Sequence, residues 1–384
     1  MDSKGKENVN HTRFAALAAA ALGGALLLAN CGSDPAPATE DTAGGSGAQP
    51  TPSESCPSGT VNAEGSSAQK NAIEEAIAAY QAECPDVTIN YNPTGSGAGI
   101  KQFNAAQVDF AGSDSALKTE ADSGKSEAEA AKERCGGNEA WDIPMVVGPI
   151  AVAYNVAGVD GLVLDGPTTA KIFNGTIKTW NDQAIAKLNP GVTLPSDKIA
   201  VFYRSDESGT TENFMKYLQA ASAGAWKTEP SKTWEGAGSG KTKSDGVAEG
   251  VKSTPNSITY VEWSYARDNK LAMAKVDTGS GTPVELTGES AGQAVAAAKP
   301  DGTGNDLRLS LDYATKADGA YPIVLVTYEV VCSKGLDASK TELVKGFLTS
   351  FASQKTQDSL QEIGYAPLPA EVRTKVDAAI KAIS

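Results

Sequence analysis

The sequence has little histidine and few basic residues. Its 384 residues include one histidine, His11, and 33 Lys and Arg against 47 Asp and Glu, which gives a formal net charge of -14 at pH 7. Affinity for nucleic acid comes from clustered Lys and Arg, so this balance argues against a nucleic-acid ligand. Histidine is also a common triad base and zinc ligand, and His11 lies in an N-terminal segment that we expect to be removed. The sequence therefore predicts neither a His-based triad nor a metal site, and it implies no cofactor.

Long hydrophobic runs are also scarce. The N-terminal run over 14–29 follows basic residues and is shorter than the roughly 20 apolar residues that a membrane-spanning helix needs. Basic residues before a short apolar run are typical of an export signal peptide. The run ends in Leu-Ala-Asn-Cys, which resembles the lipobox of bacterial lipoproteins, although Asn30 is larger than the residue usual there. We therefore predict a signal peptide over 1–31 and a lipid, such as palmitate, on Cys31.

Residues 32–55 consist mostly of Ser, Pro, Thr, Ala and Gly with scattered acids. Such a segment cannot bury enough apolar surface to offset the entropy lost on ordering, so it predicts a disordered tether. Signal, lipid and tether together predict a chain that is exported and anchored by lipid to the outer face of the cell membrane.

The chain has five cysteines, and no two of them are spaced as C-x-x-C. With Cys31 assigned to the lipid, four remain in the exported part of the chain, where disulfides can persist. Three pairings are possible, and the sequence alone does not decide between them. We favour Cys56 with Cys84 and Cys135 with Cys332, because the first two flank one strand–helix unit and would meet at one edge of a sheet.

From residue 61 onward, short apolar runs alternate with amphipathic stretches, which is typical of an α/β protein. The pattern predicts a helix over 68–82, a strand over 87–91, a helical stretch over 100–106 and a strand over 108–112. Small polar residues follow three successive strands, namely Ser66, Ser67, Ser96, Ser113 and Asp114. In an open parallel sheet such strand ends meet at one edge, where ligands bind.

A fourth element of this kind lies in the middle of the chain. A strand over 199–203 precedes a helix over about 212–221, and the residues between them offer donors to an anion: Arg204, Ser208, Gly209 and Thr210. Backbone N–H groups in the first turn of a helix lack intrahelical partners, and the helix dipole is positive there. The alternative is purely structural. In that case these residues would only cap the helix, and Arg204 would pair with Asp206 or Glu207.

A family resemblance rests on four segments taken in order, 65–68, 94–97, 108–114 and 204–210. Together they look like the phosphate-contacting segments of the periplasmic phosphate-binding component of Pst-type ABC transporters. The connecting stretches are similar as well, at 172–180, 185–190 and 258–263, so the resemblance extends over about 61–369. It implies a type II periplasmic-binding-protein fold, with two α/β domains, a central ligand cleft and two hinge strands.

The resemblance also implies a set of phosphate-binding residues. They are Ser66, Ser67, the Ala68 amide, Ser96, Asp114, Arg204, Ser208 and the amides of Gly209 and Thr210. Hydroxyls and helix N-termini would hold the anion without net positive charge nearby. The family further implies a monomer that is not an enzyme, and that binds inorganic phosphate and delivers it to the permease and ATPase subunits of an ABC transporter.

Asp114 is unexpected in such a set, since a carboxylate repels an anion. Hydrogen phosphate carries a proton that a carboxylate can accept, whereas sulfate carries none. Asp114 would then select phosphate over sulfate. The alternative is that Asp114 caps the helix after it.

The binding segments lie in the first third and in the middle of the chain, so a ligand held by both would occupy a cleft. Strand-like stretches over 144–155 and 321–333 would cross between two domains. We expect domain I over 56–147 plus 325–384 and domain II over 150–322. Closure about the crossing strands would bury the anion.

Other functions are compatible with parts of the sequence. A binding protein for another tetrahedral oxyanion, such as sulfate or molybdate, would share most of these features. Ser67 and Lys70 match the S-x-x-K of serine hydrolases that recognise penicillin, but the companion K-T-G is absent. Residues 236–242 approach a P-loop, yet Glu235 stands where its first glycine belongs.

Overall fold

The computed structural model describes residues 56–121 and 124–384. The predicted signal peptide over 1–31, the lipidated Cys31 and the tether over 32–55 lie outside the described residues. Within them, none of the helices is long and apolar enough to cross a membrane.

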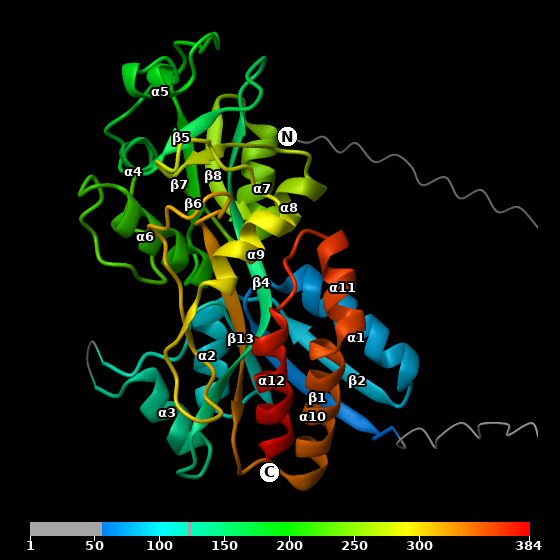
Figure 1. Ribbon diagram of the computed structural model, residues 1–384. Coiled ribbons are helices and arrows are strands. Elements are labelled where there is room, and N and C mark those ends of the chain that lie inside the picture. Colours follow the sequence, from blue (N-terminus) through cyan, green and yellow to red (C-terminus); the bar gives the residue numbers. More distant parts are fainter. Residues whose placement is uncertain (1–55, 122–123) are drawn as a thin grey trace, which may run out of the picture. The chain divides into compact units, whose positions relative to one another are not determined.

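Most strands join one mixed sheet (Figure 1). In spatial order they are β2 (Val87–Asn92), β1 (Gly59–Gly65), β3 (Phe110–Ser113), β13 (Val324–Cys332), β4 (Ala140–Asn155), β8 (Ser257–Glu262), β6 (Ala200–Arg204) and β7 (Ser239–Lys241), and β9 (Ala272–Met273) also pairs with β4. β1 is parallel to β2 and β3, whereas β13 is antiparallel to β3 and β4. Two short pairs lie outside this sheet, β5 (Val163–Asp165) with β10 (Lys275–Asp277) and β11 (Lys299–Pro300) with β12 (Leu309–Ser310).

Helices lie between many of these strands along the chain, and three helices follow the last strand. The helices are α1 (Lys70–Glu83), α2 (Ser96–Asn104), α3 (Glu127–Arg134), α4 (Gly166–Phe173), α5 (Gln183–Leu188), α6 (Gly209–Ala221), α7 (Lys243–Ser253), α8 (Trp263–Asp268), α9 (Gly288–Ala296), α10 (Ala338–Ala352), α11 (Gln354–Glu362) and α12 (Ala370–Ala382). In Figure 1, α1, α10, α11 and α12 pack together beside β1 and β2. The chain is therefore α/β, as the sequence predicted.

Two long strands, β4 and β13, run through the middle of the sheet. β4 pairs with β13 over its first part, from Ala140 to Pro149, and with β8 over its second part, from Ile150 to Asn155. Almost every side chain of both strands is buried. They correspond to the two crossing stretches predicted from the sequence, although β4 begins earlier than expected and β13 begins later. Because the sheet is continuous, the division into two domains with the stated boundaries stays a prediction.

The N-terminal elements follow the predicted order with shifted boundaries. The helix expected over 68–82 is α1, whose apolar face is buried. The helix expected over 100–106 starts earlier, at Ser96, because Gly95 adopts a φ of 107° and turns the chain directly into the helix. The strand expected over 108–112 is β3, which starts two residues later.

Disulfides join Cys56 to Cys84 and Cys135 to Cys332 in the structure. This is the pairing that we favoured from the sequence. The first disulfide closes the unit formed by β1 and α1. The second ties the end of α3 to the end of β13, since Cys135 is the C-cap of α3.

Candidate functional site

The four segments predicted to bind a ligand meet at one place in the structure. Ser66 directly follows β1, Asp114 directly follows β3, and Ser96 is the first residue of α2. Arg204 ends β6, and Ser208 is the N-cap of α6. The parallel strands β1 and β3 are neighbours, so they present Ser66 and Asp114 at the same edge of the sheet. Every residue of the predicted set is buried.

Three hydroxyl groups donate to the Asp114 carboxylate. Ser66 Oγ lies 2.5 Å and Thr327 Oγ1 lies 2.8 Å from Oδ1, and Ser96 Oγ lies 3.0 Å from Oδ2. Burial raises the pKa of Asp114 to about 6, although the hydroxyls of Ser66 and Thr327 act to lower it. The carboxyl is therefore mostly ionised at neutral pH and serves as an acceptor. Thr327 was not in the predicted set, because a threonine inside a buried strand carries no binding signal.

The alternative role of Asp114 as a helix cap is wrong. The next helix, α3, begins at Glu127, and its N-cap is Ser126. Asp114 is held across the site instead, because Asn213 Nδ2 on α6 donates to the Asp114 carbonyl oxygen at 2.7 Å.

The helix α6 begins at Gly209, earlier than the expected start near residue 212. Ser208 Oγ accepts a hydrogen bond from Thr211 N at 3.2 Å, so the capping role considered for this serine is confirmed. The amides of Gly209 and Thr210 belong to the first turn of the helix, where backbone donors lack intrahelical partners. These two amides can therefore donate hydrogen bonds to an anion.

Gly209 makes the closest approach between α6 and the strand ends. Its amide donates to Ser96 Oγ at 3.3 Å. A Cβ at this position would lie 2.5 Å from Asp114 Cβ and 2.7 Å from Ser96 Oγ. Glycine is required here because any side chain would separate α6 from Asp114.

Arg204 is anchored by one carboxylate and leaves one nitrogen for the site. Its Nε and Nη2 donate to Asp206 at 2.8 and 2.5 Å, so the pairing with Asp206 considered from the sequence is confirmed. Its Nη1 lies 3.1 Å from Ser244 Oγ and 3.4 Å from Thr210 Oγ1. Burial acts to lower the pKa of Arg204, but the hydrogen bonds to Asp206 together with the charges of Asp206 and Glu262 raise it overall, so the guanidinium stays cationic.

Ser244, in the first turn of α7, belongs to the site although the sequence analysis missed it. Its Oγ lies 3.0 Å from Ser67 Oγ, and its amide donates to the same atom at 3.3 Å. With the Arg204 contact, Ser244 links two residues of the predicted set. The signal was present, because Ser244 is in the first turn of the helix that follows β7, much as Ser96 is in the first turn of the helix that follows β2.

The stretch over 236–242, which approaches a P-loop, has a different role. It includes β7, whose residues are exposed at the edge of the sheet. Lys241 Nζ lies 5.2 Å from the centre of the Phe202 ring, which is a surface cation–π contact. This geometry does not support a nucleotide site.

The S-x-x-K residues are also engaged elsewhere. Ser67 Oγ contacts Ser244 Oγ, and Lys70 Nζ forms an ion pair with Asp245 at 3.5 Å. Within residues 56–121 and 124–384, no group of three or more His, Cys, Asp or Glu is placed to hold a metal ion.

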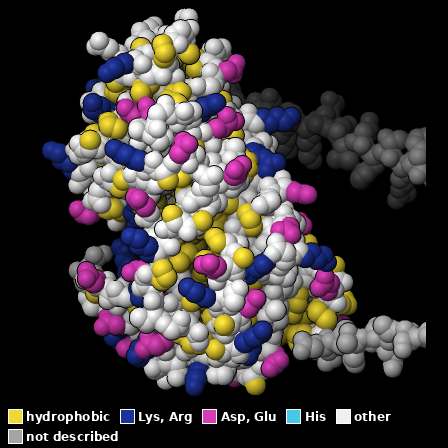
Figure 2. All heavy atoms as spheres, viewed as in Figure 1, with side chains coloured by type: hydrophobic (Ala, Val, Ile, Leu, Met, Phe, Trp, Pro, Cys, Tyr) yellow, Lys and Arg dark blue, Asp and Glu magenta, His cyan; other side chains and the backbone are white. Residues whose placement is uncertain are grey.

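The charges at the site do not by themselves favour an anion. Arg204 is accompanied by Asp114, Asp206 and the buried Glu262, which accepts a hydrogen bond from Thr210 Oγ1 at 2.5 Å. On the face shown in Figure 2, Lys and Arg are interspersed with Asp and Glu and form no continuous basic patch. An anion here would therefore depend on neutral hydroxyl and amide donors.

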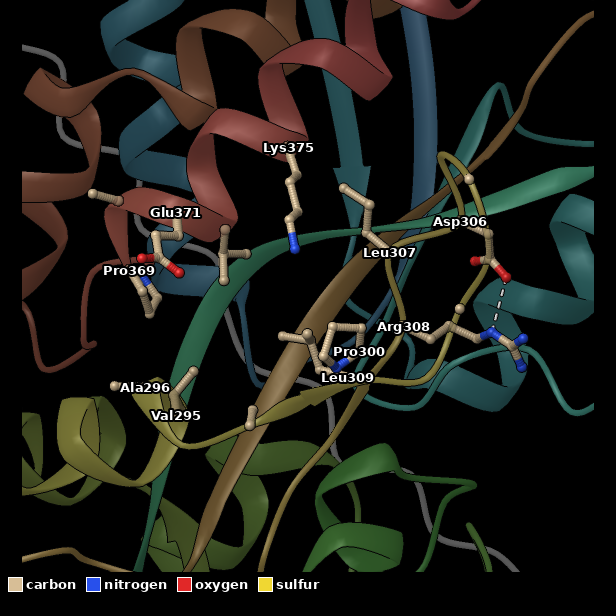
Figure 3. Close-up of a pocket in the computed structure, with 15 residues that line it drawn as sticks. Val295, Ala296, Pro300, Asp306, Leu307, Arg308, Leu309, Pro369, Glu371 and Lys375 are labelled. Atoms are coloured by element: carbon tan, nitrogen blue, oxygen red, sulfur yellow. Dashed lines mark hydrogen bonds and ion pairs between the residues drawn. The ribbon is translucent and has the colours of Figure 1, made fainter.

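Cavities lie on two sides of the β11–β12 segment. A polar cavity of about 660 Å³ reaches Asp114 and is also lined by Lys216 and Arg308. A second cavity of about 490 Å³ lies between this segment and the start of α12, and Figure 3 shows Lys375 of α12 extending toward it. None of the predicted site residues lines this second cavity. Of the predicted site residues, Asp114 alone lines the first cavity.

Comparison with known proteins places this geometry in a family. The model of the PBP superfamily domain matches residues 50–355. The phosphate-binding protein PstS 3 of Mycobacterium tuberculosis is 46% identical over 379 residues, which cover 97% of this chain and 99% of the relative. PstS 2 of the same organism is 47% identical over 84% of this chain and 87% of the relative. PstS of Xylella fastidiosa is 34% identical over 76% of each chain.

Solved structures share the fold at lower identity. A high affinity periplasmic phosphate-binding protein, PfluDING, solved with phosphate, aligns with a TM-score of 0.65 at 21% identity over 83% of this chain and 93% of that chain. The phosphate-binding protein of Stenotrophomonas maltophilia aligns with a TM-score of 0.62 at 21% identity and the same coverage. The fold is therefore the two-domain α/β periplasmic-binding-protein fold that the resemblance implied.

Proposed function

Because the chain belongs to the PBP superfamily and, within it, to the phosphate-binding proteins called PstS, we propose that it binds inorganic phosphate outside the cell. It then delivers the phosphate to the permease and ATPase subunits of an ABC transporter for import. The protein is a carrier and not an enzyme. Each of its binding events is reversible, and the transporter supplies the energy.

The observation that carries this proposal is the buried, ionised Asp114 among donors to an anion. An anion that also has a proton satisfies this acceptor, and hydrogen phosphate has one. The donors near it are the hydroxyls of Ser67 and Ser244, the amides of Ala68, Gly209 and Thr210, and Arg204 Nη1. The hydroxyls of Ser66 and Ser96, which donate to Asp114 here, and that of Thr210, which donates to Glu262, would turn to the anion when it binds. Ser208 contributes by capping α6 and fixing the two amides of its first turn.

Sulfate would be excluded by the same arrangement. A sulfate oxygen facing Asp114 would bring two acceptors together in a buried site, and neither could be solvated. Arsenate shares the proton of phosphate and would bind. The second candidate, a carrier of sulfate or molybdate, has no comparable observation in its favour.

Phosphate release would follow from the opening of two domains, over 56–147 plus 325–384 and over 150–322. Hydrogen bonds cross between these two parts of the chain at the site, from Gly209 N to Ser96 Oγ and from Asn213 Nδ2 to Asp114 O. Lys101 Nζ and Glu207 Oε2 add an ion pair at 2.6 Å. Bending of β4 and β13 would separate these contacts and expose the anion.

We also propose that the chain is a monomer exported by its signal peptide over 1–31 and anchored by palmitate on Cys31, with residues 32–55 as a tether. Both disulfides would form in the oxidising compartment outside the cell. Replacement Cys31→Ser should move the protein from the membrane fraction to the soluble fraction. An unchanged membrane fraction would argue against the lipid anchor.

Calorimetric titration of the purified mature chain with phosphate, arsenate, sulfate and molybdate tests the function. We expect phosphate and arsenate to bind and sulfate and molybdate to compete poorly. Binding of sulfate or molybdate without binding of phosphate would replace this proposal with the other oxyanion function.

A further inference from the structure

Glu329 is a buried acid that the proposed site does not use. It lies on the crossing strand β13, its exposed fraction is 0%, and neither carboxyl oxygen has a hydrogen-bond partner among the described residues. An ionised carboxylate without partners costs far too much free energy to persist in such a place. The Glu329 carboxyl group is therefore expected either to be protonated, and so neutral, or to have a functional role.

The neighbour of Glu329 is the amide of Gln69, the N-cap of α1. Glu329 pairs with Gly112 across β13 and β3, so its side chain projects from the same face of the sheet as a Gly112 side chain would. A Cβ on Gly112 would lie 2.0 Å from Gln69 Nε2. Gly112 thus leaves the space in which the Gln69 amide meets this face of β13.

From Gln69, hydrogen bonds lead to the proposed phosphate site. Gln69 Nε2 donates to Tyr91 Oη at 3.0 Å, and Tyr91 Oη donates to the Ser66 carbonyl oxygen at 2.7 Å. Ser66 Oγ in turn donates to Asp114. Since Tyr91 uses its proton for Ser66, Gln69 must present its nitrogen to Tyr91, which leaves Gln69 Oε1 as a buried acceptor without a donor.

We propose that Glu329 is a positioning residue that remains protonated at neutral pH and donates its carboxyl proton to Gln69 Oε1. Through Tyr91 it would thereby hold in place the turn between β1 and α1 that contains Ser66. This inference rests on the proposed phosphate function. This single hydrogen bond gives a partner to two buried groups, the Gln69 amide oxygen and the Glu329 carboxyl. It also links the strand β13, about which the domains would open, to the first phosphate-binding loop.

Ionisation of Glu329 should weaken phosphate binding. Burial raises the pKa of Glu329 to about 8, the Gln69 amide lowers it in part, and the charge of Asp114 raises it. The groups that face it are Gln69 on α1, Tyr91 on β2 and Asp114 after β3, and its partner on β4 is the apolar Ile143. Above this pKa the donor to Gln69 is lost, and a second buried negative charge stands near the bound anion.

The test measures phosphate affinity by calorimetry for the wild type, Glu329→Gln and Glu329→Met, from about pH 7.5 to about pH 9.5. Free phosphate is already mostly the dianion over this range. We expect wild-type affinity to fall by about tenfold for each unit by which bound phosphate raises the pKa of Glu329. Glu329→Gln keeps a donor and cannot ionise, so its affinity should not vary with pH. Glu329→Met has no donor and should bind more weakly at every pH.

Glu74→Gln on the exposed face of α1 is the matched control, and it should follow the wild type at each pH. A parallel fall in affinity for the wild type and Glu329→Gln, or a flat wild-type profile, would overturn the role of Glu329. Absence of phosphate binding by the wild type at every pH would instead overturn the proposed function. If Glu329→Met does not fold, the comparison of the wild type with Glu329→Gln still decides the matter.

Discussion

The Asp114 carboxylate accepts hydrogen bonds from Ser66, Ser96 and Thr327, which come from three separate segments of the chain. The resemblance to the family predicts both serines and the carboxylate in one site. Thr327 and Ser244 were missed, because sequence patterns locate strand and helix ends and do not show which side chains face them across the fold.

The replacement Asp114→Asn should reduce selectivity for phosphate. The new amide can donate to sulfate, whereas the charged acceptor for the phosphate proton is lost. We expect phosphate affinity to fall by about tenfold to a hundredfold, the worth of a hydrogen bond to a charged group, and sulfate to become a competitor. A competition titration with both anions measures the change.

Asp86→Asn, on an exposed turn, is the control for loss of one negative charge. It should leave the affinities for both anions unchanged. Selectivity that stays the same in Asp114→Asn would contradict the assignment of Asp114 as the specificity residue.

The replacement Ser244→Ala should weaken phosphate binding, because it removes a donor that lies beside Ser67 and Arg204. We expect a loss of about fivefold in affinity, in line with one neutral hydrogen bond. Calorimetry measures it, with Ser253→Ala at the other end of α7 as the control. Equal affinity in the two variants would show that Ser244 only fills space.

Among the elements, α6 brings the residues near 204–210 against Asp114 and Ser96, which lie in the first part of the chain. Its first residue, Gly209, packs directly on Asp114 and Ser96. The sequence predicted a helix here but placed its start near residue 212, because helix propensity does not distinguish a turn from the first helical turn. The cap itself, Ser208, identifies the true start.

The replacement Gly209→Ala should prevent α6 from closing on the strand ends. Its Cβ would lie 2.5 Å from Asp114 Cβ, and neither neighbour can move without breaking hydrogen bonds. We expect phosphate affinity to fall by about tenfold or more through overpacking, and the melting temperature of the closed form to fall as well. Calorimetry and a melting curve measure the two effects.

Gly246→Ala in α7 is the matched control, since its Cβ would meet its nearest neighbour at 3.6 Å, an ordinary contact. It should bind phosphate as the wild type does. Wild-type affinity in Gly209→Ala would mean that α6 need not approach Asp114 for binding.

Prediction of the elements from the sequence succeeded where burial follows a simple period. The apolar faces of α1 and of the strands β2 and β6 were recognised, and the long strands β4 and β13 were found as apolar stretches. Glu329 was missed because it lies within an apolar run, which predicts a buried strand and does not draw attention to a single acid. Its neighbour Gln69 becomes apparent only from the packing of Gln69 against β13.

At the scale of the whole molecule, the site draws on segments from Ser66 to Thr327, joined through one continuous sheet. The family resemblance implied the fold, and two strand-like stretches of the sequence predicted the crossing strands. The positions of the domain boundaries cannot be read from a continuous sheet, because β4 pairs with β13 at one end and with β8 at the other.

The most direct test of the central claim is a crystal structure of the protein grown with phosphate. We predict one phosphate within hydrogen-bond distance of both Asp114 and Arg204, with the amide of Gly209 as a further donor. Phosphate bound elsewhere, or held by Arg204 without Asp114, would contradict the account.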